Sequence, residues 1–284
     1  MKKFFIKFLI IFFFSNYFVR TEEIKAFIPY YYFPTTKNLD REGLIIGKSA
    51  YQFLYFGQIK ESLNLAKLAV KINKKDEKLW LILSEAQIAN ELYEDALNSL
   101  KEAEKIKPEI SEIYFAKSNI YFKQLKFKEA QIAINKGLKI SPENYNAIFQ
   151  LGNIYLMEKN YSSALNYFDK AVKIKTDFWQ AINNKGLVYF EQDKINISAE
   201  FFEKAIAIEE NAESLLGLAS CLSLKDINSA IVIAKKALAK DPNYIEYKYR
   251  KEQLWGEKLQ NAAKKLLKND QLKEDIKIAK SKLN

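Results

Sequence analysis

Few residues in this chain of 284 could do covalent or metal chemistry. It has no histidine, which excludes histidine-based catalytic triads and metal sites with histidine ligands. Its one cysteine, Cys221, cannot form a disulfide within the chain, and its neighbours Leu218, Ala219 and Leu222 predict a small buried residue rather than a reactive thiol. The eight glycines are scattered singly, so no phosphate-binding loop is present. We therefore expect a protein that is not an enzyme and that carries no cofactor.

Small residues, in contrast, recur along the chain at a fixed interval of 34 positions. One series is Ala69, Ala103, Gly137, Ala171 and Ala205, and a second is Ser62, Ala96, Ala130, Ala164 and Ser198. A sixth unit, with Ala230 and Ala237, follows after an interval of 32. A fixed period of this length predicts a solenoid of helix pairs. Because small side chains let two helix backbones approach closely, both series should be buried at helix–helix contacts.

The unit at residues 145–178 shows the pattern most clearly. Leu151 and Tyr155 lie at helical spacing, and after a short polar break Ala164 and Phe168 mark the buried face of a second helix. Two helices joined by so short a connection should pack antiparallel.

These residues resemble the tetratricopeptide repeat (TPR) family, whose pattern is Trp-x2-Leu-Gly-x2-Tyr followed by Ala, Phe, Ala and Pro. The matching residues are Trp80, Leu83, Ala96, Ala103 and Pro108 in the second repeat, Tyr121, Ala130 and Pro142 in the third, Gly186, Tyr189, Phe202 and Ala205 in the fifth, and Pro242 in the sixth. The departures are Ser84 and Ser118 at the glycine position and Thr176 and Glu210 at the closing proline. The resemblance implies an all-α, right-handed superhelical solenoid of about six repeats, whose concave groove binds peptides or protein segments.

The predicted organisation has four parts. Residues 1–26 are a signal peptide or signal anchor, and residues 27–42 are an extended segment rich in aromatic residues and proline. The TPR array covers residues 43–242, in units 43–76, 77–110, 111–144, 145–178, 179–210 and 211–242. Residues 243–284 form a C-terminal cap and a charged tail, and within them residues 244–267 are predicted to be one long amphipathic helix.

The N-terminal prediction depends on an apolar run, Phe8–Phe14, preceded by Lys2, Lys3 and Lys7. The run is short for a membrane span and has the length of the hydrophobic region of a signal peptide. Ala26 offers a cleavage point, but the charged residues before it leave a retained anchor open. We expect export or anchoring on the extracytoplasmic face, in the periplasm or thylakoid lumen. The alternative is a signal anchor that leaves the protein on the cytoplasmic face of a membrane.

The segment Phe27–Pro34 has five aromatic residues in eight and two prolines, so it cannot form a stable helix. It is predicted to pack along the first repeat or, alternatively, to contact a membrane interface. Asp40 is the expected N-cap of the helix that follows, with Glu42 in the first turn.

The formal charge of +10 would suit nucleic acid or an anionic membrane as a partner. However, arginine occurs only at positions 20, 41 and 250, and lysines alternate with glutamates along the predicted helices. That pattern is typical of a solvated surface, so we expect no nucleic-acid partner.

Within the TPR family, the first helix of each repeat lines the groove, with inward positions at roughly the second, fifth, sixth, ninth, twelfth and thirteenth residues. Applied to repeats three to five, the resemblance implies these peptide-binding residues: Phe115, Asn119, Phe122, Phe149, Gln150, Asn153, Met157, Asn183, Asn184 and Phe190. Amide side chains pair with the main chain of any peptide, and aromatic faces supply apolar area. Asn119 and Asn153, one repeat apart, could form a short ladder. The cationic residues of carboxylate-binding TPR grooves are missing.

The expected function is a non-enzymatic scaffold or assembly factor that binds protein or peptide partners, at a membrane reached through the N-terminus, with no small-molecule substrate. The chain resembles membrane-associated TPR assembly factors of cyanobacteria and plastids. Two segments add to this resemblance: Phe27–Pro34 and Leu254-Trp255-Gly256-Glu257. The alternatives are a regulatory TPR subunit of an enzyme complex and a nucleic-acid-associated helical repeat protein.

Overall fold

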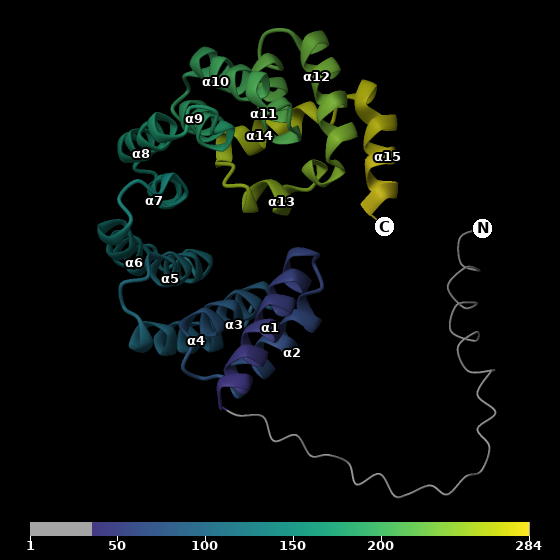
Figure 1. Ribbon diagram of the computed structural model, residues 1–284. Helices are drawn as coiled ribbons and strands as arrows, with labels where there is room; N and C mark the ends of the chain where they lie inside the picture. Colours follow the sequence, from purple (N-terminus) through teal and green to yellow (C-terminus); the bar gives the residue numbers. More distant parts are fainter. Residues whose placement is uncertain (1–35, 284) are drawn as a thin grey trace, which may run out of the picture.

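The computed structural model describes residues 36–283, and within that range every regular element is a helix. Consecutive helices pack as pairs, and the pairs follow one another around an arc (Figure 1). The first helices of the pairs are α1 (Thr36–Tyr55), α3 (Glu77–Ala89), α5 (Ser111–Lys123), α7 (Tyr145–Met157), α9 (Trp179–Glu191) and α11 (Ala212–Leu222). The second helices are α2 (Ile59–Ile72), α4 (Tyr93–Ile106), α6 (Phe127–Ile140), α8 (Tyr161–Ile174), α10 (Ile195–Ile208) and α12 (Ile227–Lys240). The predicted all-α solenoid of about six repeats is confirmed.

The small residues that recur through the chain lie where helices meet. Every member of both series is buried, as are Ala230 and Ala237 in the last pair. Gly152 shows why some positions need glycine: a Cβ atom there would lie 2.6 Å from a ring carbon of Phe168 on the paired helix. The close approach of α7 and α8 therefore depends on the missing side chain.

The turn inside each of the first five pairs has one conformation. Gly57, Glu91, Leu125, Lys159 and Asp193 all have positive φ, between 59° and 73°. In the second to fifth pairs the next residue's N–H bonds back to a carbonyl near the end of the first helix, at 2.8–2.9 Å. This is the left-handed ending common at helix C-termini, and only the first pair has glycine there.

The start of α1 differs from the prediction. The helix begins at Thr36, so residues 36–42 are helical and Asp40 lies inside the helix rather than at its N-cap. The extended segment was expected to reach residue 42, but past Pro34 no proline or glycine interrupts the chain until Gly43, so the helix starts earlier. Residues 1–26 and Phe27–Pro34 lie outside the described residues. None of the described helices is both long and apolar enough to cross a membrane.

The C-terminal part is broken where one long helix was predicted. After a 3-10 turn, η1 (Pro242–Ile245), come α13 (Tyr247–Glu252), α14 (Glu257–Leu266), a second 3-10 turn, η2 (Asp270–Leu272), and α15 (Lys273–Leu283). The break between α13 and α14 falls at Leu254, whose φ is 64°, and at Gly256, which is extended. The prediction of one helix over 244–267 is therefore wrong, because amphipathic spacing does not reveal the positive φ at Leu254 that separates α13 from α14.

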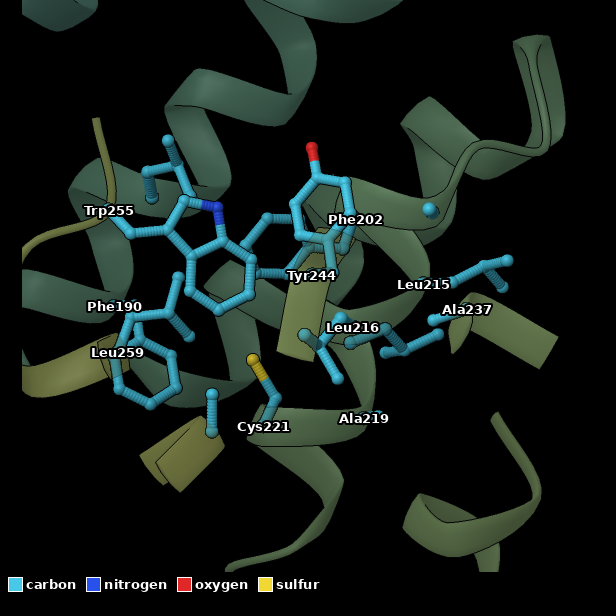
Figure 2. Close-up of a cluster of buried hydrophobic side chains, with 14 of the residues drawn as sticks. Phe190, Phe202, Leu215, Leu216, Ala219, Cys221, Ala237, Tyr244, Trp255 and Leu259 are labelled. Carbon is cyan, nitrogen blue, oxygen red and sulfur yellow. The ribbon is translucent and has the colours of Figure 1, made fainter. Parts of the chain in front are cut away.

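The largest buried cluster joins the last repeats to this C-terminal part. Figure 2 shows Phe190, Phe202, Leu216, Trp255 and Leu259 within it. Residues from α9, α10, α11 and the C-terminal segment thus share one core, which fixes the concave face of the last two repeats.

Candidate functional site: the concave groove

The first helices of four successive pairs line an open hollow of about 770 Å³. Its lining comes from α1, α3, α5 and α7: Leu54, Glu85, Ile88, Ala89, Glu112, Phe115, Ala116, Asn119, Phe122, Phe149, Gln150 and Asn153. Figure 1 shows α4, α6, α8 and α10 on the outer side of the arc, so this hollow lies on the concave side. We call it the open groove.

The structure brings six of the ten predicted residues together in the open groove. They are Phe115, Asn119, Phe122, Phe149, Gln150 and Asn153, all half-buried. Met157 is also half-buried but does not line the hollow. The prediction missed the part of the groove supplied by the first two repeats.

The aromatic residues of the open groove are held from behind by the core. Phe149 lies edge-on to Phe178, with ring centroids 5.0 Å apart, and tilted against Phe168 at 5.6 Å. The Phe115 ring covers Gly137 of the paired helix so closely that a Cβ there would lie 2.4 Å from it. These side chains present one face to the groove and are fixed before any ligand arrives, which lowers the entropic cost of binding.

Three of the predicted peptide-binding residues are buried: Asn183, Asn184 and Phe190. The prediction that they lie on the free surface of the groove is wrong. Their exposed fractions are 0%, 6% and 3%. Helix α14 packs across α9 and α11 on the side of the arc where a peptide was expected, whereas Asn183 and Asn184 are engaged in hydrogen bonds between first helices. Phe190 shares a buried cluster with Leu259 of α14 (Figure 2).

A ladder of polar side chains crosses three first helices. Asn184 donates to Asn153 Oδ1 at 2.8 Å, Asn183 donates to Asn184 Oδ1 at 3.1 Å, and Ser214 Oγ donates to Asn183 Oδ1 at 2.8 Å. The ladder links α7, α9 and α11, whereas the predicted one paired Asn119 with Asn153. Buried amides that are satisfied in this way fix the register of adjacent repeats.

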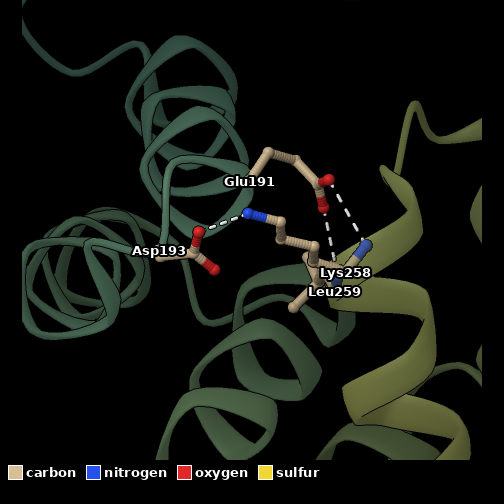
Figure 3. A network of polar contacts seen from close by, with 4 residues as sticks. All are labelled: Glu191, Asp193, Lys258 and Leu259. Atoms are coloured by element: carbon tan, nitrogen blue, oxygen red, sulfur yellow. Dashed lines mark hydrogen bonds and ion pairs between the residues drawn. The ribbon is translucent and has the colours of Figure 1, made fainter.

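The C-terminal segment is anchored on the concave surface by Glu191, at the end of α9. Its carboxylate accepts the backbone N–H groups of Lys258, at 3.3 Å, and Leu259, at 3.0 Å, in the first turn of α14 (Figure 3). The Lys258 ammonium pairs with Asp193. A carboxylate at a helix N-terminus satisfies free N–H groups and complements the helix dipole. Gly256 permits the contact, because a Cβ there would lie 2.2 Å from the Glu191 carboxyl carbon.

Glu213 is the most perturbed carboxyl group of this region. Burial raises its pKa to about 7, while hydrogen bonds from Asn183, Trp255 and Tyr244 act in the opposite direction. Trp255 Nε1 donates to Glu213 Oε1 at 3.3 Å. The C-terminal segment thus covers an acidic group that is partly protonated at neutral pH.

Glu213→Gln should change how stability depends on pH. The folded-state pKa lies above the ordinary 4.5, so the stabilisation is complete below about pH 4.5 and is lost as pH rises to about 7. Glutamine cannot ionise, so the variant should gain about 2–3 kcal/mol over the wild type between about pH 5 and pH 8. Urea unfolding of both proteins at the two pH values measures the gain. Parallel pH profiles would show that Glu213 ionises normally in the folded state.

Cys221 is a small buried residue, as predicted. It is 2% exposed, its thiol donates to Ser198 Oγ at 3.5 Å, and burial raises its pKa to about 12. A thiol that stays protonated at neutral pH is a poor nucleophile.

The comparisons with known proteins agree with this geometry. Descriptions of the tetratricopeptide repeat match residues 111–144, 145–178 and 180–211. These segments are tetratricopeptide repeats. Further helix pairs of the same kind come before residue 111, α1 with α2 and α3 with α4, and after residue 211, α11 with α12.

Solved structures similar to this chain include MamA, with a TM-score of 0.51 at 21% identity over 61% of this chain and 93% of that one. PilF of Pseudomonas aeruginosa has a TM-score of 0.61 at 13% identity, over 76% of this chain and 98% of its own. PilW, a widely conserved type IV pilus biogenesis factor, has a TM-score of 0.61 at 18% identity, over 77% and 97%. At these identities the likeness shows the fold alone. No curated protein sequence matches the chain.

Proposed function

We propose that this TPR chain is a protein-binding scaffold, not an enzyme, and that a segment of its partner binds in the open groove. The observation that carries the proposal is the hollow of about 770 Å³ whose whole lining comes from first helices. Half-buried aromatic and aliphatic side chains offer apolar contact area, and Asn119, Gln150 and Asn153 offer donors and acceptors to a peptide main chain.

Site-specific crosslinking in cells that express the full chain tests this proposal. A photo-crosslinking residue replaces Gln150 in the open groove or, as the matched control, Asn166, which is exposed on α8. The groove position should yield a discrete protein adduct, and the α8 position should not. An adduct at Asn166 alone would place the functional surface on the outer side of the arc.

Blocking the groove provides the second measurement. Asn119→Arg with Gln150→Arg adds bulk and charge to the hollow without removing core atoms. The control, Asn135→Arg with Asn166→Arg, places the same groups on exposed sites of α6 and α8. In this experiment the crosslinking residue is at Ile88. The double variant in the groove should abolish the adduct, and the double variant on α6 and α8 should leave it unchanged. Equal effects of the two pairs would contradict the proposal.

We further propose that residues 1–26 bring the scaffold to a membrane, where it assists assembly of a protein complex. The support is the sequence itself, with three lysines before the apolar run Phe8–Phe14. Fractionation of cells that express the full chain tests it, and recovery only from the cytoplasm would contradict it. The likeness to membrane-associated assembly factors of cyanobacteria and plastids loses one support, because packing of the C-terminal segment explains Leu254, Trp255 and Gly256.

A further inference from the structure

The chain already holds one helix on its concave surface, and that helix shows what the surface accommodates. Helix α14 lies across α9 and α11 with Leu259, Ala263 and Leu266 buried, at spacings of four and three residues. A carboxylate of the array, Glu191, caps its N-terminus. The concave side of the last two repeats is therefore a seat for an amphipathic helix.

The open groove repeats the key apolar position of that seat. Phe190, in the cluster that α14 covers, is the twelfth residue of its repeat unit. The twelfth residues of the first three units are Leu54, Ile88 and Phe122, which all line the open groove and are half-buried. These three positions form an apolar stripe across α1, α3 and α5. Helix α14 covers Phe190, but within residues 36–283 no element covers this stripe in the same way.

The charge of the open groove is opposite to that of the chain. Among the described residues that line it, Glu85 and Glu112 are acidic and none is lysine or arginine, although the whole chain has a formal charge of +10. Both residues are exposed, although partial burial of its carboxyl group raises the pKa of Glu85, and neither forms an ion pair within residues 36–283. A cationic group in the groove would meet two unpaired carboxylates beside an apolar stripe.

We propose that the open groove binds an amphipathic helix of a partner protein, with apolar residues at three- and four-residue spacing and at least one lysine or arginine. The apolar side of that helix lies on Leu54, Ile88 and Phe122, and its basic group pairs with Glu85 or Glu112. This proposal rests on the proposed function, since it names the kind of segment that the scaffold binds.

A displayed library of random 16-residue peptides, selected on the immobilised full chain in detergent, tests it. Peptides that bind the wild type but not Asn119→Arg with Gln150→Arg are retained as groove ligands. We expect them to be helical when bound, to carry apolar residues at the stated spacing and to contain lysine or arginine. A central proline should abolish binding of such a peptide, because it breaks a helix but not an extended strand.

The charge pairing is then measured by fluorescence anisotropy. Replacing the basic residue of a selected peptide by glutamine should weaken binding roughly fivefold or more, and so should Glu85→Gln with Glu112→Gln in the protein. The two changes together should weaken it no more than one alone, as expected for groups that pair. Glu129→Gln with Glu200→Gln, on exposed sites of α6 and α10, is the matched control and should have no effect.

The outcomes separate the two proposals. Groove ligands that tolerate the central proline or lack a basic residue would overturn the helix proposal and leave the scaffold function standing. Absence of any groove-dependent ligand, together with absence of a crosslinked adduct at Gln150, would overturn both. Association of two copies of the chain that is lost in the groove variant would assign the groove to a second copy instead of a partner protein.

Discussion

Phe202→Ala should lower the free energy of unfolding by about 3–5 kcal/mol, because the ring is fully buried and its removal leaves a cavity in the core. The ring stands between two glycines of flanking helices. A Cβ on Gly186 of α9 would lie 2.8 Å from it, and a Cβ on Gly217 of α11 would lie 2.7 Å from it. The three helices close around this ring, so alanine leaves a cavity that rigid backbones cannot fill.

Phe201 provides the control at the next position. Its ring is half-buried, stacks on Tyr189 with centroids 5.2 Å apart and lies beneath the ammonium groups of Lys185 and Lys204. Phe201→Ala should therefore cost only about 1 kcal/mol. Guanidinium unfolding followed by circular dichroism measures both variants. Equal losses would mean that the ring between the two glycines is not the centre of this part of the core.

The fold could be predicted from the sequence because the repeat encodes it many times. A glycine, alanine or serine at one position of every unit is buried in every described unit, so each repeat supports the register of the others. The turn residues Glu91, Leu125, Lys159 and Asp193 carry no such signal. Their positive φ values arise from the helix ending, which holds the same conformation with four different side chains.

The open groove could have been predicted more completely than it was. All twelve lining residues fall on the six inward offsets of the TPR unit, including Leu54 in the first repeat and Glu85, Ile88 and Ala89 in the second. The prediction applied those offsets only to repeats three to five. It therefore missed Glu85 and two of the three residues of the apolar stripe, Leu54 and Ile88. It also left out Glu112, at the second offset of the third repeat.

The sequence also indicates that the concave side of the last repeats is covered. The inward offsets of the sixth unit carry only small and aliphatic residues up to its twelfth position: Ala212, Leu215, Leu216, Ala219 and Leu222. A groove surface of this kind needs a cover. Residues 243–284 were predicted as the cap, but their place on the concave side could not be derived. The contact of Glu191 with the start of α14 joins residues far apart in sequence and depends on the absent side chain of Gly256.

Trp255→Ala should lower the free energy of unfolding by about 3–5 kcal/mol and should act on the last repeats first. The indole is 4% exposed, packs near Tyr244 with ring centroids 6.2 Å apart and donates its N–H to Glu213. Its removal leaves a cavity under the C-terminal segment and takes a hydrogen bond from the carboxyl group of Glu213. Because repeats interact mainly with their neighbours, the loss should stay near α9 and α11.

Hydrogen exchange locates the effect of Trp255→Ala. Amides of α9 and α11 should exchange faster in the variant, while those of α3 and α5 keep their wild-type protection. Tyr247→Ala, at a side chain 55% exposed on α13, is the control and should leave both regions unchanged. A uniform increase in exchange along the array would show instead that the solenoid unfolds as one unit.

The same variant should also remove the effect of pH that Glu213 causes. Once Trp255 is gone, water reaches the carboxyl group and its pKa should fall toward the ordinary 4.5. Glu213→Gln, which gains stability between about pH 5 and pH 8 in the wild-type background, should then gain almost none. A gain that persists in the Trp255→Ala background would mean that Asn183 and Tyr244, rather than the indole, shield this carboxyl group from water.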